Sequence, residues 1–271
     1  MRIPRVAAIH DLSGFGRCSL TIAIPILSAM GVQCCPLPTS IFSNHTGYES
    51  FFSTDYTAHM NAYMDEWAKL SLQFDGILTG YLGSAEQVNI VKRFFELFKK
   101  PQTLTVVDPV MGDGGKLYPS YSPVLARELK GLLPYADVLT PNLTEACFLT
   151  ETDYKPDMTP EELTNICQKL SAEGPKQIVI SGIERNDYLE NFVFERGKEP
   201  QIISVPKEGP CRAGTGDVFS SIIAADMVNG KELTAAVEHA TAFISKALRH
   251  TARLNLPLPD GICFEEYLSE I

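Results

Sequence analysis

The sequence contains no apolar run of the roughly 18 to 20 residues that a membrane-spanning helix requires. It also lacks a Ser- or Gly-rich linker, an internal repeat and a low-complexity tract. We therefore expect no membrane partner, and the unbroken pattern predicts a single domain over residues 1–271. With 45% hydrophobic residues, a chain of this length can bury a large core, which excludes a disordered protein.

A zinc-type or redox arrangement of cysteines is also missing. The seven cysteines include no Cys-x-x-C pair and no Cys/His pair at zinc spacing, and their number is odd. This pattern is typical of reduced thiols. Residues 1–5 lead directly into a strand-like stretch, so we expect no signal peptide and a cytoplasmic protein.

Basic residues are scarce relative to acidic ones. The chain has 23 Lys and Arg against 33 Asp and Glu, a formal net charge of −10. Because nucleic acids are bound through a basic surface, this balance argues against a nucleic-acid partner. An anionic ligand would have to be held by local features of the backbone.

Segments rich in β-branched residues alternate with segments of helical period up to residue 180. The predicted strands are residues 6–9, 32–37, 76–79, 104–107, 137–139 and 177–180. The predicted helices are residues 19–30, 58–72, 85–99, 123–132, 143–150 and 160–172. An antiparallel hairpin (188–194 and 201–205) and two helices (218–228 and 233–249) follow. This order predicts an α/β fold of three layers, with a mostly parallel central sheet and helices on both faces.

In such a sheet, ligands bind in the crevice beyond the carboxyl ends of the strands. The strongest motif is Ala213-Gly214-Thr215-Gly216-Asp217, a loop of small residues that opens directly into an apolar helix. Its glycines allow close approach of backbone N–H groups, and the helix N-terminus favours an anion. Asp217 is placed to accept a proton from a hydroxyl that attacks phosphorus. Alternatively, Thr215 caps the helix and Asp217 only complements the helix dipole.

Two further acidic segments follow predicted strands. Asp108 ends one strand and Asp113 lies in the Gly-rich loop after it, which suits Mg²⁺ held through water, although Asp and Gly are also ordinary turn residues. Thr140-Pro141-Asn142-Leu143-Thr144-Glu145 follows the next strand. Asn142 and Glu145 fit a capping box, and the same placement would let Glu145 organise the water shell of a metal.

Polar loops follow three other strands. Residues 42–48 and 79–83 offer hydroxyl, amide and aromatic groups for a flat polar ring. Residues 11–16 (Asp-Leu-Ser-Gly-Phe-Gly) are similar to a dinucleotide fingerprint, but the acidic residue expected about 20 positions later is missing. A dehydrogenase is therefore disfavoured.

In this combination and order, the motifs resemble the vitamin B6 kinases of the ribokinase superfamily, the pyridoxal, pyridoxamine and pyridoxine kinases. The segments that carry the resemblance are Phe42-Ser43-Asn44-His45-Thr46-Gly47-Tyr48, Gly80-Tyr81, Asp108-Pro109-Val110-Met111-Gly112-Asp113, Thr140-Pro141-Asn142-Leu143-Thr144-Glu145 and Gly214-Thr215-Gly216-Asp217. The resemblance implies a ribokinase-like fold and ATP-dependent phosphorylation of the 5′-hydroxymethyl group of a B6 vitamer. It also implies a homodimer and, as in many members, use of a monovalent cation such as K⁺.

The resemblance further implies roles for individual residues. Asp217 would be the catalytic base, and the amides of Gly214, Thr215 and Gly216 would stabilise the transferring phosphoryl group. The implied ATP-binding residues are Asp108, Asp113, Thr140, Asn142, Glu145 and Ser181, of which Asp108 and Glu145 would hold Mg²⁺ mostly through water. The implied vitamer-binding residues are His45, Thr46 and Tyr81.

One segment departs from the B6 kinase pattern. His10-Asp11-Leu12-Ser13-Gly14 is more similar to the Asp-x-Ser-Gly loop of hydroxymethylpyrimidine kinases than to the Gln-Ser pair of pyridoxal kinases. Asp11 would then pair with a substrate amine, with Ser13 as an alternative contact. Hydroxymethylpyrimidine kinase is therefore the nearest alternative, and a vitamer-binding protein without turnover is a second. A sugar kinase is disfavoured, because the short loops around the first helix leave no room for the lid strands of that group.

Overall fold

In the computed structural model, which describes residues 2–119 and 121–271, nine strands form one sheet in the order β11-β10-β9-β8-β5-β4-β1-β2-β3. The strands are β1 (Arg5–Ser13), β2 (Gln33–Phe42), β3 (Ser53–Asp55), β4 (Gly76–Thr79), β5 (Leu104–Val107), β8 (Val138–Leu139), β9 (Gln177–Arg185), β10 (Tyr188–Glu195) and β11 (Gln201–Pro206). The six strands from β2 to β9 in this order pair in parallel, whereas β3, β10 and β11 pair antiparallel at the two edges. The predicted α/β class and mostly parallel sheet are confirmed.

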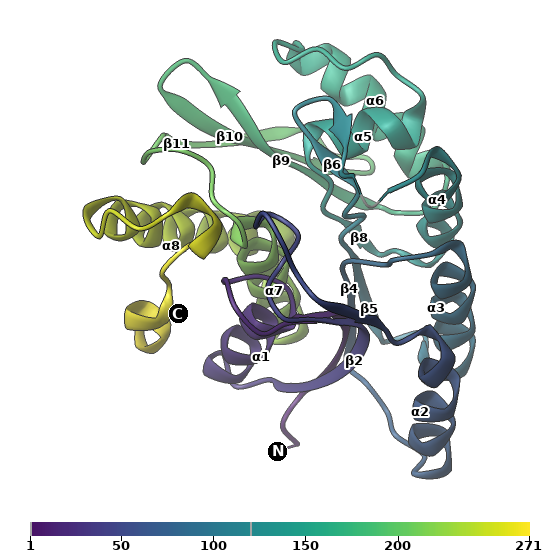
Figure 1. The fold of residues 1–271 in the computed structure, drawn as a ribbon. Helices are drawn as coiled ribbons and strands as arrows, with labels where there is room; N and C mark the ends of the chain where they lie inside the picture. The colour runs from purple at the N-terminus through teal and green to yellow at the C-terminus, as the bar shows by residue number, and fades with distance from the viewer. Residues whose placement is uncertain (1, 120) are drawn as a thin grey trace.

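Helices cover both faces of the sheet (Figure 1). One face carries α1 (Leu20–Ala29), α7 (Thr215–Val228) and α8 (Leu233–Arg253). The other carries α2 (Thr57–Lys69), α3 (Ala85–Phe98), α4 (Pro123–Leu129), α5 (Leu143–Thr150) and α6 (Pro160–Ala172). Side chains of β1 alternate between these two layers, with Val6 and Ala8 in one apolar core and Ala7 and Ile9 in the other. A strand buried on both faces reads as a continuous apolar run, which is the pattern that predicted it.

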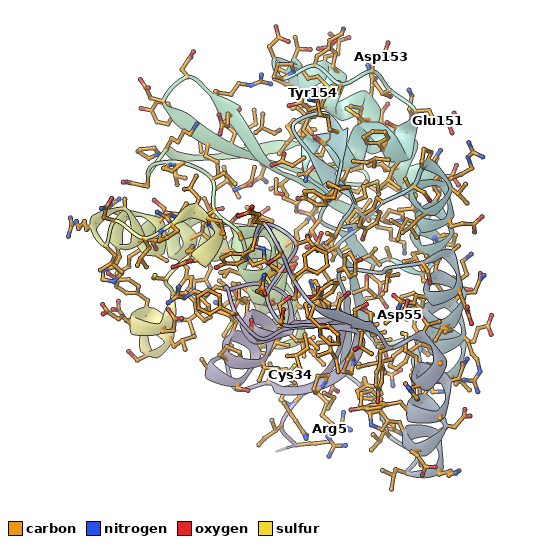
Figure 2. All side chains as sticks on the ribbon, viewed as in Figure 1. Arg5, Cys34, Asp55, Glu151, Asp153 and Tyr154 are labelled. Carbon is orange, nitrogen blue, oxygen red and sulfur yellow. The ribbon has the colours of Figure 1, made fainter. Side chains whose placement is uncertain are left out.

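Smaller elements connect the main ones. They are the two-stranded ribbon β6 (Gly112–Asp113) and β7 (Lys116–Leu117), and the 3₁₀ helices η1 (Lys130–Tyr135), η2 (Leu258–Asp260) and η3 (Glu265–Glu270). Tyr154, labelled in Figure 2, lies over the turn of this ribbon, where a Cβ on Gly115 would come within 2.7 Å of its ring. Within the described ranges, no helix is long and apolar enough to cross a membrane.

Most predicted boundaries agree with the structure, but three strands run further than predicted: β1 to Ser13, β2 to Phe42 instead of residue 37, and β9 to Arg185 instead of residue 180. The segment from Asp11 to Ser13, predicted as a loop, belongs to the strand, which pairs with β2 as far as Ser13↔Phe42. A register shift between His10 and Leu12 accommodates the polar residues. The edge strand β3 and the ribbon β6–β7 were not predicted, because two or three residues carry no periodic signal.

Candidate active site

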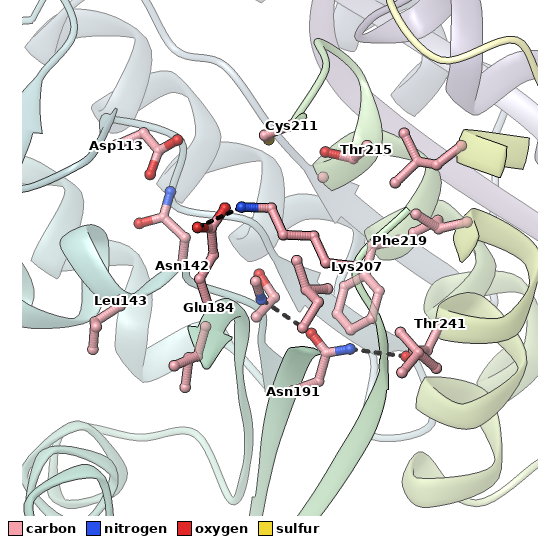
Figure 3. A pocket seen from close by; sticks show the side chains of 18 of the residues that line it. Asp113, Asn142, Leu143, Glu184, Asn191, Lys207, Cys211, Thr215, Phe219 and Thr241 are labelled. Atoms are coloured by element: carbon pink, nitrogen blue, oxygen red, sulfur yellow. Dashed lines mark hydrogen bonds and ion pairs between the residues drawn. The ribbon is translucent and has the colours of Figure 1, made fainter. Parts of the chain in front are cut away.

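A cavity of about 400 Å³ opens beyond the carboxyl ends of the strands (Figure 3). It lies between the loops that follow β5 and β8, the hairpin of β9 and β10, and the N-terminus of α7. Five of the predicted site residues line it, namely Asp113, Asn142, Ser181, Thr215 and Gly216. The structure therefore brings together three of the six predicted ATP-binding residues and two residues of the small-residue loop, whereas Asp108, Thr140 and Glu145 do not line the cavity.

The cavity wall includes a buried polar pair that the sequence did not single out. Asn191 on β10 is 2% exposed, and its amide group donates to the hydroxyl of Thr241 on α8 at 2.8 Å. Its carbonyl accepts a hydrogen bond from the backbone N–H of Gly182 at 3.1 Å. Phe219 lies beside this pair (Figure 3). Asn191 therefore connects β9 at Gly182 to helix α8.

A lysine crosses the cavity. Lys207, which follows β11, pairs with Glu184 on β9 at 2.7 Å, and Figure 3 shows its stem extended between the two walls. Both partners are partly exposed, so this pair contributes little to stability. It places a positive charge in the wall of the cavity.

The small-residue loop has the backbone geometry that its glycines predicted. Gly214 has φ +84° and precedes the first turn of α7. A Cβ at this position would lie 2.3 Å from the carbonyl oxygen of Arg17 and 2.4 Å from Cδ1 of Ile22. Only glycine fits, and the loop can therefore lie directly against the start of α1. The hydroxyl of Thr215 donates to the carbonyl of Arg212 at 3.2 Å, so Gly214, not Thr215, occupies the cap position.

Asp217 lies in the first turn of α7, next to the cavity-lining Gly216. Its side chain is 14% exposed, so it is neither sealed nor free in solvent. Oδ1 lies 2.8 Å from Nε2 of His10, and Oδ2 accepts the backbone N–H of Ser19 at 2.7 Å. Both oxygens are thus held, one by a side chain of β1 and the other by the backbone at the start of α1.

Two buried carboxylates lie further inside. Burial, and then the charge of Asp217, raise the pKa of Asp108 to about 7. Burial, and then the charge of Asp108, raise the pKa of Glu145 well above its usual value. A row of acids that raise one another's pKa is a site that a cation would stabilise. Among the described residues, however, no three His, Cys, Asp or Glu side chains are grouped closely enough to hold a metal directly.

Asn142 and Glu145 form the predicted capping box at the start of α5. The carboxylate of Glu145 also accepts the backbone N–H of Met111 at 3.0 Å, which ties the loop after β5 to the loop after β8. Thr140 is buried and lies outside the cavity lining. Glu145 therefore connects the two loops and caps α5, and backbone amides occupy part of its lone pairs.

The residues predicted for the ring substrate do not line this cavity. Asp11 and Ser13 are 5% and 0% exposed. The carboxylate of Asp11 accepts the hydroxyls of Ser13 at 2.9 Å and of Ser19 at 2.6 Å. As placed, Asp11 points into the protein, and contact with a substrate amine would require this cluster to open.

The loop of residues 43–48 is held by the segment that follows α8. His45 donates from Nε2 to the carbonyl of Pro259 at 2.6 Å, and the hydroxyl of Tyr48 donates to Asp260 at 2.9 Å. The same segment reaches the small-residue loop, because the N–H of Ile262 donates to the carbonyl of Ala213 at 3.2 Å. This contact of the carboxyl-terminal segment with both loops had no signal in the sequence.

Of the other two ring-side residues, Thr46 is exposed at the tip of this loop. Tyr81 follows β4, and its ring packs edge-on against Phe42 and Tyr121. The structure therefore places Tyr81 in an aromatic cluster beside the loop, and the predicted ring-binding roles of Thr46 and Tyr81 remain predictions.

Comparison with known proteins points to one group of enzymes. A family model described as phosphomethylpyrimidine kinase matches residues 24–257. Pyridoxal kinase PdxY of Paraburkholderia xenovorans is 30% identical over 262 residues, which cover 91% of this chain and 88% of the relative.

Solved structures extend the similarity over nearly the whole chain. A Bacteroides thetaiotaomicron protein, provisionally named a phosphomethylpyrimidine kinase and crystallised with pyridoxal, is 40% identical with a TM-score of 0.93, covering 99% of this chain and 96% of that one. Pyridoxal kinase from Lactobacillus plantarum is 28% identical with a TM-score of 0.92, covering 99% and 96%.

Proposed function

Because the chain belongs to the phosphomethylpyrimidine kinase family, we propose that it transfers the terminal phosphoryl group of ATP to the 5′-hydroxymethyl group of pyridoxal, pyridoxamine or pyridoxine. The observation that carries this proposal is the N-terminus of α7. There Thr215 and Gly216, which line the cavity, directly precede Asp217, whose side chain is 14% exposed. Exposed amides for phosphate and an adjacent base for the attacking hydroxyl are what phosphoryl transfer requires.

Substrate identity is supported by the relatives. The P. xenovorans relative is named a pyridoxal kinase, and the 40% identical structure from B. thetaiotaomicron contains pyridoxal. The nucleotide would occupy the cavity between Asn142, Ser181 and Phe219, with its phosphates toward Gly216. The vitamer would approach Asp217 from the side of the 43–48 loop.

In this proposal Asp217 accepts the proton of the 5′-hydroxyl as the oxygen attacks the γ-phosphorus of ATP and the bond from that phosphorus to the leaving ADP breaks. The amides of residues 214–216 stabilise charge on the transferring group. Asp108 and Glu145 would hold Mg²⁺ through water, since both are buried acids whose pKa values are raised by burial and by a neighbouring carboxylate charge that a cation would offset. The backbone amides that Glu145 accepts leave only part of its lone pairs for this contact. The metal would neutralise the phosphates. Asp113 and Thr140 would complete the nucleotide side.

The alternative substrate is hydroxymethylpyrimidine, which the name of the matching family model favours. The test is a comparison of kcat/KM for pyridoxal, pyridoxamine, pyridoxine and hydroxymethylpyrimidine, with ATP and Mg²⁺ present and the Asp217→Asn variant as background. We expect turnover of at least one B6 vitamer. Turnover of the pyrimidine alone would overturn the substrate assignment, and ring binding without ATP consumption would indicate a non-catalytic vitamer-binding protein.

We further propose a cytoplasmic, single-domain homodimer that uses K⁺ or another monovalent cation. One sheet that runs through the chain supports the single domain. Phe51 and Phe52, which are 46% and 72% exposed beside the edge strand β3, support self-association. Light scattering of the purified protein, and kinase assays with K⁺ replaced by a large organic cation, would test the last two points.

A further inference from the structure

A buried row of three ionisable side chains runs from the inside of β1 to the proposed catalytic base. Nδ1 of His10 lies 2.9 Å from Oδ1 of Asp11, and Nε2 of His10 lies 2.8 Å from Oδ1 of Asp217. His10 is 6% exposed and Asp11 is 5% exposed. No role predicted from the sequence involved His10.

The imidazole ring has little freedom to move. A Cβ on Gly80, at the end of the adjacent strand β4, would lie 2.0 Å from Cδ2 and 2.1 Å from Nε2 of His10. The ring therefore lies flat against the backbone of Gly80. The N–H groups of Asp11 and Tyr81 lie 2.9 and 3.2 Å from Nδ1. When the ring is neutral, Nδ1 accepts from these amides, and when it is protonated, Nδ1 donates to Asp11. In both states Nε2–H donates to Asp217.

Ser19 completes the arrangement from the start of α1. Its backbone N–H donates to Asp217 at 2.7 Å and its hydroxyl donates to Asp11 at 2.6 Å. Ser19 has φ +56°, a conformation that is unfavourable for a residue with a side chain. This strained backbone directs two donors of one residue at the two carboxylates, which points to a functional requirement for the arrangement.

We propose that His10 is a positioning residue for phosphoryl transfer, which holds the Asp217 carboxylate in one orientation between Nε2–H and the Ser19 amide and couples it to Asp11. This inference rests on the proposed kinase function. A carboxylate held on both oxygens is already oriented when the hydroxyl arrives, and a displacement of about 1 Å at such a group costs about 100-fold in rate.

The electrostatics of the row agree with this geometry. Burial lowers the pKa of His10, but the hydrogen bonds and charges of Asp11 and Asp217 outweigh burial and raise the pKa to about 10. The other ionisable groups that interact with the row are Asp108, Cys18 and Tyr121. Burial together with the two carboxylates keeps the Cys18 thiol protonated by raising its pKa to about 12. The raised pKa of His10 favours the protonated ring, whose charge lies between the two carboxylates.

The test uses two substitutions at His10, assayed for steady-state kinetics between pH 5 and 9. His10→Gln keeps a hydrogen-bond donor but carries no charge, and His10→Leu has neither a donor nor a charge. We expect kcat to fall between about 10- and 100-fold, more for Leu than for Gln, with the KM for ATP within a few-fold of wild type. We also expect the acid limb of the kcat profile to move to higher pH in His10→Gln, because a carboxylate that loses a neighbouring positive charge keeps its proton to higher pH.

His239→Gln is the matched control, because His239 pairs with the buried Asp226 at 2.7 Å at the far end of α7. It should leave kcat and the acid limb unchanged. If His10→Leu does not fold, His10→Gln decides the question. A His10→Gln variant with wild-type kcat and an unmoved acid limb overturns the inference alone, whereas a wild-type protein without kinase activity overturns the proposed function and this inference together.

Discussion

Replacing Gly214 by alanine tests whether the close approach of the small-residue loop to α1 shapes the phosphate site. The new Cβ would lie 2.3 Å from the Arg17 carbonyl oxygen and 2.4 Å from Ile22 Cδ1, at a residue with φ +84°. The left-handed conformation costs alanine about 1–2 kcal/mol. Overlap with a backbone oxygen, which cannot rotate away, adds about 1–3 kcal/mol. We expect a loss of stability of about 2–5 kcal/mol.

Two other glycines separate these contributions. Gly230 has φ +93° but open space around it, so Gly230→Ala should cost only the conformational part. Gly216 has neither a positive φ nor a neighbour within 4 Å, yet it lines the cavity, so Gly216→Ala should keep full stability and lower kcat/KM for ATP.

The assays are urea unfolding and steady-state kinetics. Unfolding can be followed by the fluorescence of Trp67, the single tryptophan, which packs against Phe74 and Phe94 on the opposite side of the sheet. Because loss of one positioned donor typically costs about 10²- to 10³-fold in kcat, a displaced loop in Gly214→Ala should lower kcat/KM for ATP at least tenfold. Equal stability of Gly214→Ala and Gly230→Ala, together with unchanged kinetics, would refute the reasoning.

Three further outcomes are expected. Asp217→Asn should lower kcat by at least about 10²-fold and leave the KM for ATP within a few-fold, and near-normal turnover would remove Asp217 from the role of base. Asn191→Leu leaves the Gly182 N–H and the Thr241 hydroxyl without their buried partner, so thermal unfolding should show a loss of about 1–3 kcal/mol and kinetics a higher KM for ATP; an unchanged melting temperature would contradict this. The folded-state pKa of His10 is raised from 6.5 to about 10, so its stabilising contribution is complete below pH 6.5 and is lost as pH rises toward 10. The free energy of unfolding of the wild type should therefore fall more steeply with rising pH than that of His10→Gln between pH 6.5 and 10. Parallel slopes would argue against the raised pKa of His10.

The layered fold was predictable because its signals are local. The boundaries of α5 and α6 agree with the prediction, since Asn142 and Thr159 begin these helices with capping boxes that are visible in the sequence. The continuation of β1 past Ile9 was not predictable, because polar residues in a strand are stabilised by partners far along the chain. His10 and Asp217 are separated by 207 positions, a contact that no local pattern reports.

The candidate site was predictable in its parts but not in its connections. The small-residue loop, Asp217 and the residues predicted for the nucleotide side each carried a motif. Asn191 offered one weak signal that was missed, an amide within the apolar strand Tyr188–Glu195. The inward orientation of Asp11 could not be inferred, because it depends on Ser19 and on a backbone conformation that serine rarely adopts.

The segment after α8 has a consequence for how two ligands would influence each other. Through Pro259 and Asp260 it is bonded to His45 and Tyr48 of one loop, and through Ile262 it is bonded to Ala213 of the other. A shift of either loop therefore disturbs bonds that also restrain its counterpart. By thermodynamic linkage, any synergy between nucleotide and ring substrate that passes through this segment must be equal in both directions. A chain that stopped at Leu254 would keep every residue of the proposed chemistry and lose these bonds.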